Sequence, residues 1–499
     1  MHRPNLYRPN LYRPDTVATR TAARVATVIA LAAAALLPAP AGATDTTPPA
    51  VRSGKAKNLI FFLGDGMGPV TVTAARIYGG EKAGLAIPEK HKLTMEQLAR
   101  SAKIRTYSQD AQTTDSAPGM SSYITGVKSR NEVISMSPDT LPNDPSGKQY
   151  QVDGDSTCPA TGNGHAVETL LETMKARGYG TGVVSTTRIT HATPATTYAH
   201  VCNRNAENTI AAQMVPGGAS YNWRLGADGL DVVLGGGRRH FLPATGGGTR
   251  TDSRNLIDEM RAAGYQYVAS GTELSNVDPA STRKLLGLFH ASDMSYELDR
   301  VKNRVDEPSL AEMTAKAIHL LSRAEQGYFL LVEGGRIDHA LHGTNAKRAL
   351  EDTLAFDAAI AVALSKVDLN ETLVVVTADH DHTMAFNGYS KIGNPILGLL
   401  RDYQSGELAK DAQGKPFTTL VFGNGGGPRN DVRDDLTQVD TQADDYLQEV
   451  AVPLGAPGSE THGGGDVMLF ADGPGAYRLR GTMDNVDVYP RLRTALGLW

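Results

Sequence analysis

Five short apolar runs constrain the fold of this chain more than any other feature. Their Val, Ile, Leu and Phe residues follow one another without the alternation that a strand with one solvated face would show. Both faces of each predicted strand must therefore be covered, which is typical of a mostly parallel sheet with helices on either side. The runs are Asn58–Leu63, Thr181–Ser185, Tyr328–Val332, Leu373–Thr377 and Asp466–Phe470.

Amphipathic stretches between these runs predict helices. One covers 167–177 and ends at Gly178, a second covers 309–326, and a third covers 344–367. The second opens with Ser309 three residues before Glu312, which is the spacing of a capping box. Strands that alternate with helices predict a doubly wound α/β domain, in which ligands bind at the carboxyl ends of the strands.

Residues 384–460 show little strand or helix periodicity and contain glycine-rich turn clusters. We interpret this stretch as an insertion or cap on the α/β domain. A long irregular surface loop is the alternative, and composition alone does not separate the two.

The N-terminal segment resembles an export signal. Five arginines precede the apolar run Val25–Leu37, and Ala41-Gly42-Ala43 follows as a cleavage site. A membrane anchor or a core helix is the alternative, but a bilayer needs about 20 apolar residues and this run is shorter. We expect removal of residues 1–43, one domain over residues 44–499, no later membrane span, and a periplasmic or secreted protein.

The two cysteines and the charge balance narrow the chemistry. Cys158 and Cys202 are too few for a four-thiolate zinc site, so metal binding would rest on histidines and carboxylates. Export makes a disulfide between them the expected state, with two free thiols as the alternative. The net charge of −5 argues against nucleic acid as the main partner.

A glycine-rich turn follows the first apolar run, and it contains Asp65. The spacing is not that of a dinucleotide fingerprint, and a carboxylate there would repel a pyrophosphate. Asp65 is therefore a candidate metal ligand, although an aspartate in such a turn is often only a turn residue.

Acid and imidazole groups follow two further runs. Glu333, Asp338 and His342 come after the third run, and Asp379 and His380 come after the fourth. Carboxylate oxygens and imidazole nitrogens together are the donors that zinc prefers. Two such groups at neighbouring strand ends predict a metal site rather than two solvated loops, and His462, just before the last run, could complete it.

Ser116 is a candidate nucleophile at the start of a predicted helix. Asp115 can cap that helix, which places Ser116 at its first position and Pro118 in its first turn. Serine is ordinarily only a helix-start residue there. With zinc nearby it becomes an activated nucleophile, since the metal and the helix terminus both favour the alkoxide.

Six motifs in order give the chain its closest resemblance. GDGMG, TTDSA, HATP, VEGGRIDHALH, TADHDH and THGGGD lie between Asn58 and Asp472 and resemble the alkaline phosphatases. The resemblance implies a phosphomonoesterase that uses two zinc ions and one magnesium ion, forms a phosphoserine intermediate, acts on small phosphate monoesters and is commonly a homodimer. It also implies that residues 384–460 correspond in size to the crown insertion of the animal enzymes.

The same resemblance assigns roles to individual residues. Ser116 would be the nucleophile, and Arg204 would grip the substrate phosphate. The first zinc would be bound by Asp338, His342 and His462; the second by Asp65, Asp379 and His380; and the magnesium by Asp65, Thr193 and Glu333. His191 and His339 stand where the best-known bacterial enzyme has Asp and Lys, so zinc would compete for the third site, with His191 as a further ligand.

Two rival functions remain open at this point. A phosphodiesterase or sulfatase on a related scaffold would generally use Thr or a modified Cys as its nucleophile, whereas this motif has Ser116. A non-catalytic phosphate- or metal-binding protein is the other rival, and the intact nucleophile argues against it.

Overall fold

All five apolar runs form strands of one sheet in the computed structural model, which describes residues 52–426 and 433–499. The sheet has ten strands, and its two antiparallel pairings are both made by β16. The expected mostly parallel sheet is therefore confirmed. In spatial order the strands are β17 (Gly481–Asp484), β2 (Arg100–Arg105), β16 (Val467–Asp472), β10 (Thr372–Thr377), β1 (Asn58–Gly64), β9 (Tyr328–Gly334), β5 (Gly180–Arg188), β6 (Val232–Gly236), β8 (Leu285–Leu288) and β7 (Gln266–Val268).

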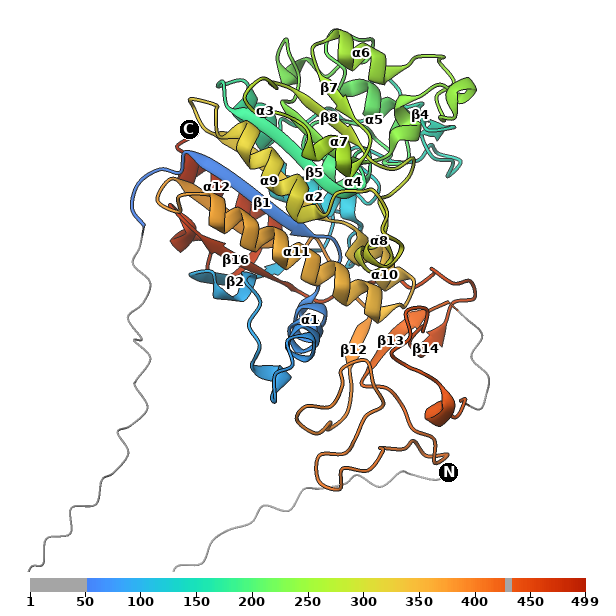
Figure 1. Cartoon of the computed structure of the whole chain (residues 1–499). Coiled ribbons are helices and arrows are strands. Elements are labelled where there is room, and N and C mark those ends of the chain that lie inside the picture. Colours follow the sequence, from blue (N-terminus) through green and yellow to red (C-terminus); the bar gives the residue numbers. More distant parts are fainter. Residues whose placement is uncertain (1–51, 427–432) are drawn as a thin grey trace, which may run out of the picture. The chain divides into compact units, whose positions relative to one another are not determined.

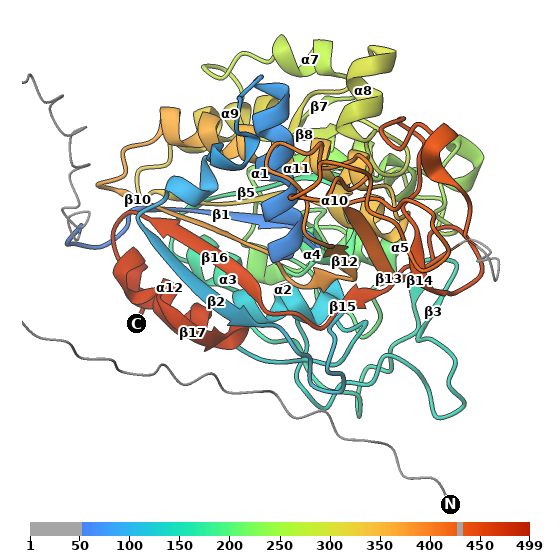
Figure 2. The same ribbon diagram turned by 90° about the horizontal axis from the view of Figure 1, so that it is seen from below.

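Helices cover both faces of this sheet. Figures 1 and 2 show α9 and α11 over one face, and α2, α3 and α12 on the other. Both faces of the central strands are consequently buried, as their continuous apolarity requires. The helices are α1 (Pro69–Lys82), α2 (Ser116–Thr125), α3 (Leu170–Lys175), α4 (Ala192–Ala195), α5 (Glu207–Gln213), α6 (Leu256–Ala262), α7 (Gly271–Ser275), α8 (Glu297–Asn303), α9 (Leu310–Leu321), α10 (Arg336–His342), α11 (Ala346–Lys366) and α12 (Val488–Leu496).

The predicted helices exist, with shorter bounds. α9 begins after Ser309, whose side chain and that of Glu312 form the expected capping box. α3 begins three residues later than predicted because Thr169 and Glu172 form a second capping box there. The sequence carries the Thr-x-x-Glu spacing at this point, so the later start was readable from it.

Strand direction brings distant parts of the chain to one edge of the sheet. β10, β1, β9 and β5 are parallel neighbours, so their carboxyl ends meet at the same edge. β16 runs antiparallel to β10, so the residues that precede β16 reach that edge from the opposite direction. This is why His462, which comes before its strand, lies beside residues that follow theirs.

Residues 384–460, which we call the crown segment, contribute β12 (Met384–Phe386), β13 (Leu420–Gly425) and β14 (Val450–Pro453) to a small sheet of their own. This sheet is visible below α10 in Figure 1. Just outside the segment, β11 (Asp381–His382) pairs with β15 (His462–Gly463), with His382 opposite His462. The two ends of the crown segment therefore meet beside the sheet edge described above. A separate hairpin is formed by β3 (Gln151–Val152) and β4 (Asp155–Ser156).

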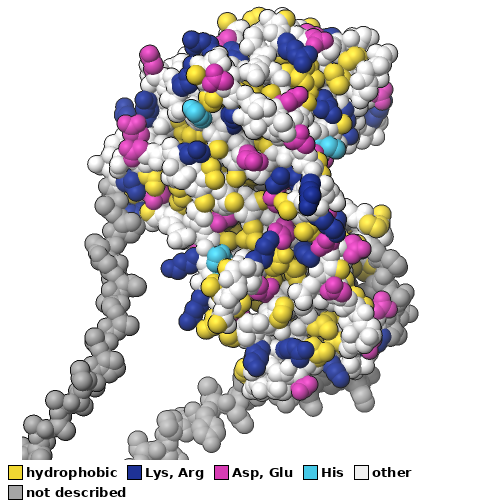
Figure 3. Space-filling view, in the orientation of Figure 1, with side chains coloured by type: hydrophobic (Ala, Val, Ile, Leu, Met, Phe, Trp, Pro, Cys, Tyr) yellow, Lys and Arg dark blue, Asp and Glu magenta, His cyan; other side chains and the backbone are white. Residues whose placement is uncertain are grey.

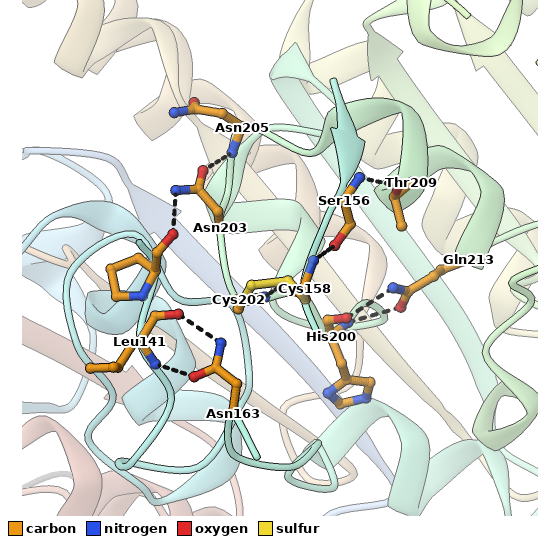
Figure 4. Close-up of a disulfide and its surroundings, with 11 residues drawn as sticks. Leu141, Ser156, Cys158, Asn163, His200, Cys202, Asn203, Asn205, Thr209 and Gln213 are labelled. Carbon is orange, nitrogen blue, oxygen red and sulfur yellow. Dashed lines mark hydrogen bonds between the residues drawn. A yellow bond between two sulfur atoms is a disulfide. The ribbon is translucent and has the colours of Figure 1, made fainter. Parts of the chain in front are cut away.

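Cys158 and Cys202 form the predicted disulfide, with their Cα atoms 6.1 Å apart. Figure 4 shows this bond among backbone and side-chain hydrogen bonds. Gln213 holds His200 by accepting from its backbone N–H and donating to its backbone oxygen. The cross-link thus lies in a well-bonded loop region close to Arg204 in sequence.

Lys and Arg are interspersed with Asp and Glu over the face drawn in Figure 3. The predicted export signal, residues 1–43, lies outside the described residues. Within the described ranges, no helix combines the length and apolarity needed to cross a bilayer.

Candidate active site

Ser116 occupies the first position of α2, as predicted, and its side chain is buried. Asp115 caps the helix, since its Oδ1 accepts from the backbone N–H of Ala117 at 2.6 Å. Ser116 Oγ lies 3.3 Å from Asp65 Oδ1 and 3.2 Å from His380 Nε2. The candidate hydroxyl is therefore within hydrogen-bonding distance of two predicted metal ligands.

Asp65, Asp379 and His380 form the second cluster. Asp65 follows β1 and the other two follow β10, and one ligand atom from each lies within 4.8 Å of the others. Gly66 lies in the turn directly after Asp65. Its φ is +64°, and a Cβ there would meet the His382 ring at 2.4 Å. The Gly66 N–H donates to Asp379 Oδ1 at 3.1 Å, which fixes this carboxylate relative to Asp65.

The second cluster concentrates charge away from water. Burial and the nearby Asp65 carboxylate raise the pKa of Asp379 to about 8. Burial alone would lower the pKa of His380, but Asp379 and Asp65 outweigh it and raise the pKa to about 9. Asp379 Oδ2 is buried and has no hydrogen-bond partner among the described residues. A divalent cation would neutralise these carboxylates and engage that oxygen.

Asp338, His342 and His462 form the first cluster, which adjoins the second through stacked His380 and His462 rings with centroids 3.5 Å apart. His342 Nδ1 faces the backbone oxygen of Glu460 at 2.5 Å, and His462 Nδ1 faces that of Thr114 at 2.8 Å. A carbonyl oxygen only accepts, so each Nδ1 must carry the hydrogen.

The Nε2 atoms of these two histidines are then left with lone pairs that converge. The two Nε2 atoms lie 3.1 Å apart. Asp338 Oδ1 lies 3.3 Å from His342 Nε2 and 3.5 Å from His462 Nε2. Facing lone pairs repel unless a proton or a metal cation lies between them. Nδ1 bound to oxygen and Nε2 free is also the arrangement that metal-binding histidines ordinarily show.

His382 is a functional residue that sequence reasoning missed. Its Nε2 lies 2.7 Å from Asp338 Oδ1 and its Nδ1 lies 2.7 Å from Glu460 Oε2. The ring is fully buried, and these two carboxylates outweigh its burial and raise the pKa of His382 to about 10. Although His382 is close enough to join the metal cluster, both its nitrogens are engaged by carboxylates, so it holds Asp338 rather than a metal. His382 is the second histidine of the TADHDH motif, and His380 is the first. The motif therefore contained a signal for it.

Asp65, Glu333 and His191 form a third group, with ligand atoms within 4.8 Å of one another. Thr193, on α4, brings its Oγ1 to 3.5 Å from Asp65 Oδ2. Ser185 and Thr187 both donate to Glu333 Oε2, while Glu333 Oε1 and His191 Nδ1 are buried without a partner in the described part of the chain. Burial and the two Arg side chains nearby lower the pKa of His191 to about 3, which keeps it neutral as a ligand must be.

Arg204 reaches the same region from the loop after α4. Its Nη1 lies 3.2 Å from Asp115 Oδ1, and its Nη2 donates to His191 Nε2 at 2.8 Å. The guanidinium is thus held between the cap of the Ser116 helix and the third group. A planar fork in this position can bind two oxygens of a phosphoryl group.

All the predicted site residues therefore converge on one edge of the sheet. Oxygen and imidazole donors in the first two clusters suit zinc, and the largely oxygen set around Glu333 suits magnesium, with His191 extending it toward zinc. The unpartnered oxygens of Asp379 and Glu333 and the converging histidine lone pairs fit divalent cations. The His339 ring packs edge-on against that of His191, with centroids 5.4 Å apart. His339 Nδ1 accepts a hydrogen bond from Arg336.

Comparisons with known proteins agree with this geometry. A family model described as alkaline phosphatase matches residues 56–498. The alkaline phosphatase of Gadus morhua is 37% identical over 453 residues, which cover 86% of this chain and 90% of that protein. The tissue-nonspecific alkaline phosphatase isozyme of Homo sapiens is 38% identical over 452 residues, covering 85% of this chain and 81% of that protein.

Solved structures show the same fold. The alkaline phosphatase of Thermus thermophilus matches with a TM-score of 0.66 and 27% identity, covering 93% of this chain and 96% of that chain. The alkaline phosphatase of the Antarctic bacterium TAB5 matches with a TM-score of 0.61 and 22% identity, covering 89% of this chain and 100% of that chain. This chain therefore belongs to the alkaline phosphatase family and is a phosphoric monoester hydrolase.

Proposed function

We propose that this protein is an exported alkaline phosphatase that hydrolyses small phosphate monoesters through a phosphoserine intermediate on Ser116 and releases inorganic phosphate. The observation that carries the proposal is the position of the Ser116 hydroxyl, 3.3 Å from Asp65 and 3.2 Å from His380. Contact between a buried serine hydroxyl and two candidate metal ligands supports a nucleophilic role rather than that of an ordinary helix-start residue.

The metals would be held by the three clusters already described. Asp338, His342 and His462 would hold one zinc, and Asp65, Asp379 and His380 a second. Asp65, Thr193 and Glu333 would hold magnesium, or zinc with the help of His191. When bound, the two zinc ions would offset the charge of the phosphate dianion, favour the serine alkoxide and stabilise the leaving oxygen.

The residues of the chain supply position and direction. Ser116 Oγ would attack phosphorus, so that the new Oγ–P bond forms as the ester O–P bond breaks and the alcohol leaves. Arg204 would hold two phosphoryl oxygens while Asp115 fixes both its guanidinium and the start of α2. A water would then break the Oγ–P bond, returning a proton to Ser116 Oγ and releasing phosphate.

The third site has its own support. Two TAB5 alkaline phosphatase mutants, His 135 Glu and His 135 Asp, are described with magnesium bound in the M3 site. In this chain Glu333 and Thr193 would offer oxygens to the metal, and His191 lies beside them. Because His191 Nε2 accepts from Arg204, this ring would supply a nitrogen to the metal only after that contact breaks. We infer that magnesium occupies this site and that zinc competes for it.

Export, dimerisation and a capping role for the crown segment complete the proposal. Export is supported by the arginine-rich and apolar leader and by the Cys158–Cys202 disulfide, which an oxidising compartment favours. Family membership supports a homodimer, and the separate small sheet of residues 384–460 supports a cap over substrate access.

The proposal is tested by metal analysis of the exported protein together with turnover of three aryl esters. We expect two zinc ions and one further divalent ion per chain, and faster hydrolysis of the phosphate monoester than of the diester or the sulfate. Faster diester or sulfate turnover, or no monoester turnover by zinc-loaded protein, would contradict it. Ser116→Ala should abolish the reaction while metal binding is retained.

A further inference from the structure

Glu460 lies at the C-terminal end of the crown segment, two residues before His462, and its carboxylate is buried. Oε2 accepts from His382 Nδ1 at 2.7 Å. Oε1 accepts from the backbone N–H of Thr383 at 2.8 Å and from its hydroxyl at 2.5 Å. His382 and Thr383 both precede the crown segment, so this one carboxylate joins its two ends.

The main chain of the same residue makes a further contact. The Glu460 backbone oxygen accepts from His342 Nδ1 at 2.5 Å. Glu460 therefore contacts two imidazoles that lie against Asp338: His382 through its side chain and His342 through its backbone. Neither contact uses an Nε2 atom, which leaves those atoms directed toward Asp338.

The side-chain contact reaches the metal ligand Asp338 through His382. His382 Nε2 lies 2.7 Å from Asp338 Oδ1, so the ring is held by a carboxylate at each end. Without Glu460, one end of the ring would lose its anchor and its buried Nδ1 would have no acceptor from this side chain. The direction of the hydrogen bond to Asp338 Oδ1 would then no longer be fixed.

We propose that Glu460 is a positioning residue for the first metal cluster, acting through His382 on Asp338 and tying both ends of the crown segment to that cluster. This inference rests on the proposed function, in which Asp338, His342 and His462 bind zinc. Removing the direct outer partner of a metal ligand typically weakens metal affinity by about 10- to 100-fold. The Glu460 carboxylate lies one side chain further from Asp338 than that partner, so we expect a loss at the low end of this range, about 10-fold.

Glu460→Ala in the full-length exported protein tests this inference, with zinc affinity measured by competition with a chromophoric chelator. One zinc equivalent should bind about 10-fold more weakly, while the equivalent at Asp65, Asp379 and His380 should be unchanged. Cobalt substituted at the weakened site should show an altered visible absorption spectrum. Affinities equal to those of the unmodified protein, or an equal loss at every site, would overturn the inference.

A double-mutant cycle separates action through His382 from a general effect. If Glu460 acts through that ring, the pair Glu460→Ala and His382→Ala should bind zinc no more weakly than His382→Ala alone. Independent, additive losses would overturn the proposed connection.

Glu172 provides a matched control, because it is also buried and its Oε1 lies 2.7 Å from His200 Nε2. Glu172→Ala removes a carboxylate–imidazole pair of the same length and a helix capping box, so it should lower the melting temperature without weakening zinc binding. An equal loss of zinc affinity in this control would overturn the inference. An unmodified protein that binds no zinc would overturn the proposed function as well. Equal zinc binding by the unmodified protein and by Glu460→Ala would remove only the role of Glu460.

Discussion

Asp352 offers a sharp test of how buried charge shapes the pH dependence of stability. This residue lies on α11, is 5% exposed, and accepts from the Glu297 backbone N–H at 3.2 Å. Burial raises its pKa from 3.8 to about 8, although Arg336 works in the opposite direction. We predict that Asp352→Asn stabilises the protein at alkaline pH.

The sign and size follow from proton linkage. The unfolded carboxyl loses its proton near pH 4, whereas the folded one keeps it up to about pH 8. The folded state therefore binds more protons in this window, so its stability falls as pH rises and the whole penalty is present above pH 8. The difference between a pKa of 3.8 and one of about 8 corresponds to on the order of 5 kcal/mol.

An asparagine carries no such penalty. The variant should match the unmodified protein only near pH 3, below the unfolded pKa of the carboxyl. Its advantage should be about 1–2 kcal/mol at pH 5 and reach its full size at pH 9. Because unfolding a unit of this size changes entropy by roughly 1 kcal/mol/K, the gain in melting temperature should be roughly 5 °C. The melting temperatures should be measured in excess chelator, so that pH-dependent metal binding does not enter the comparison.

Glu207 supplies a control of opposite sign. Burial would raise the pKa of Glu207, but Arg188 and His240 outweigh it and lower the pKa to about 2. Its contribution to stability is therefore present above its unfolded pKa and is lost as pH falls toward 2. Glu207→Gln should accordingly lower the melting temperature at pH 9. Equal or lower stability of Asp352→Asn at pH 9 would refute the reasoning.

Three further predictions concern the site and the cross-link. Arg204→Ala should raise the inhibition constant for phosphate by about 10- to 100-fold, since charged hydrogen bonds contribute about 1.5–3 kcal/mol each. The metal content should not change. Unaltered product inhibition would contradict the role of Arg204. Replacing Cys158 and Cys202 by alanine should lower the unfolding free energy by about 4 kcal/mol in the chain-entropy account, and a loss near zero in denaturant unfolding would contradict that value. Chelation should abolish monoester turnover and lower the melting temperature, because the Nε2 atoms of His342 and His462, 3.1 Å apart, repel each other without a cation between them. Added zinc should reverse both changes. Activity that survives chelation would exclude a metal requirement.

The sheet and most of the site residues were predictable because their signals are local. A strand covered on both faces must be continuously apolar, and ligands that follow parallel strands must meet at one edge. The order of the elements therefore predicts that Asp65, Asp338 and Asp379 lie at one edge of the sheet, whereas their assignment to particular metals came from the resemblance. The position of Ser116 was predictable for a similar reason, since Asp115 marks the start of its helix.

Other features depend on contacts that the order of residues does not reveal. His462 reaches the site because β16 runs antiparallel to β10, a direction that an apolar run does not encode. The roles of His382 and Glu460 depend on two 2.7 Å contacts of His382, one with Asp338 and one with Glu460 at the C-terminal end of the crown segment. The strands of that segment are short and pair with one another across long connections, so they leave little periodic pattern in the sequence.

The most direct test of the central claim is to identify the atom that carries phosphate during turnover. Zinc-loaded protein should be mixed with an aryl phosphate, quenched in acid and digested, and the peptides analysed by mass spectrometry. The account predicts phosphate on Ser116, and none in chelated protein or in Ser116→Ala. Turnover with Ser116 unmodified in every quenched sample, or with phosphate on another residue, would contradict it.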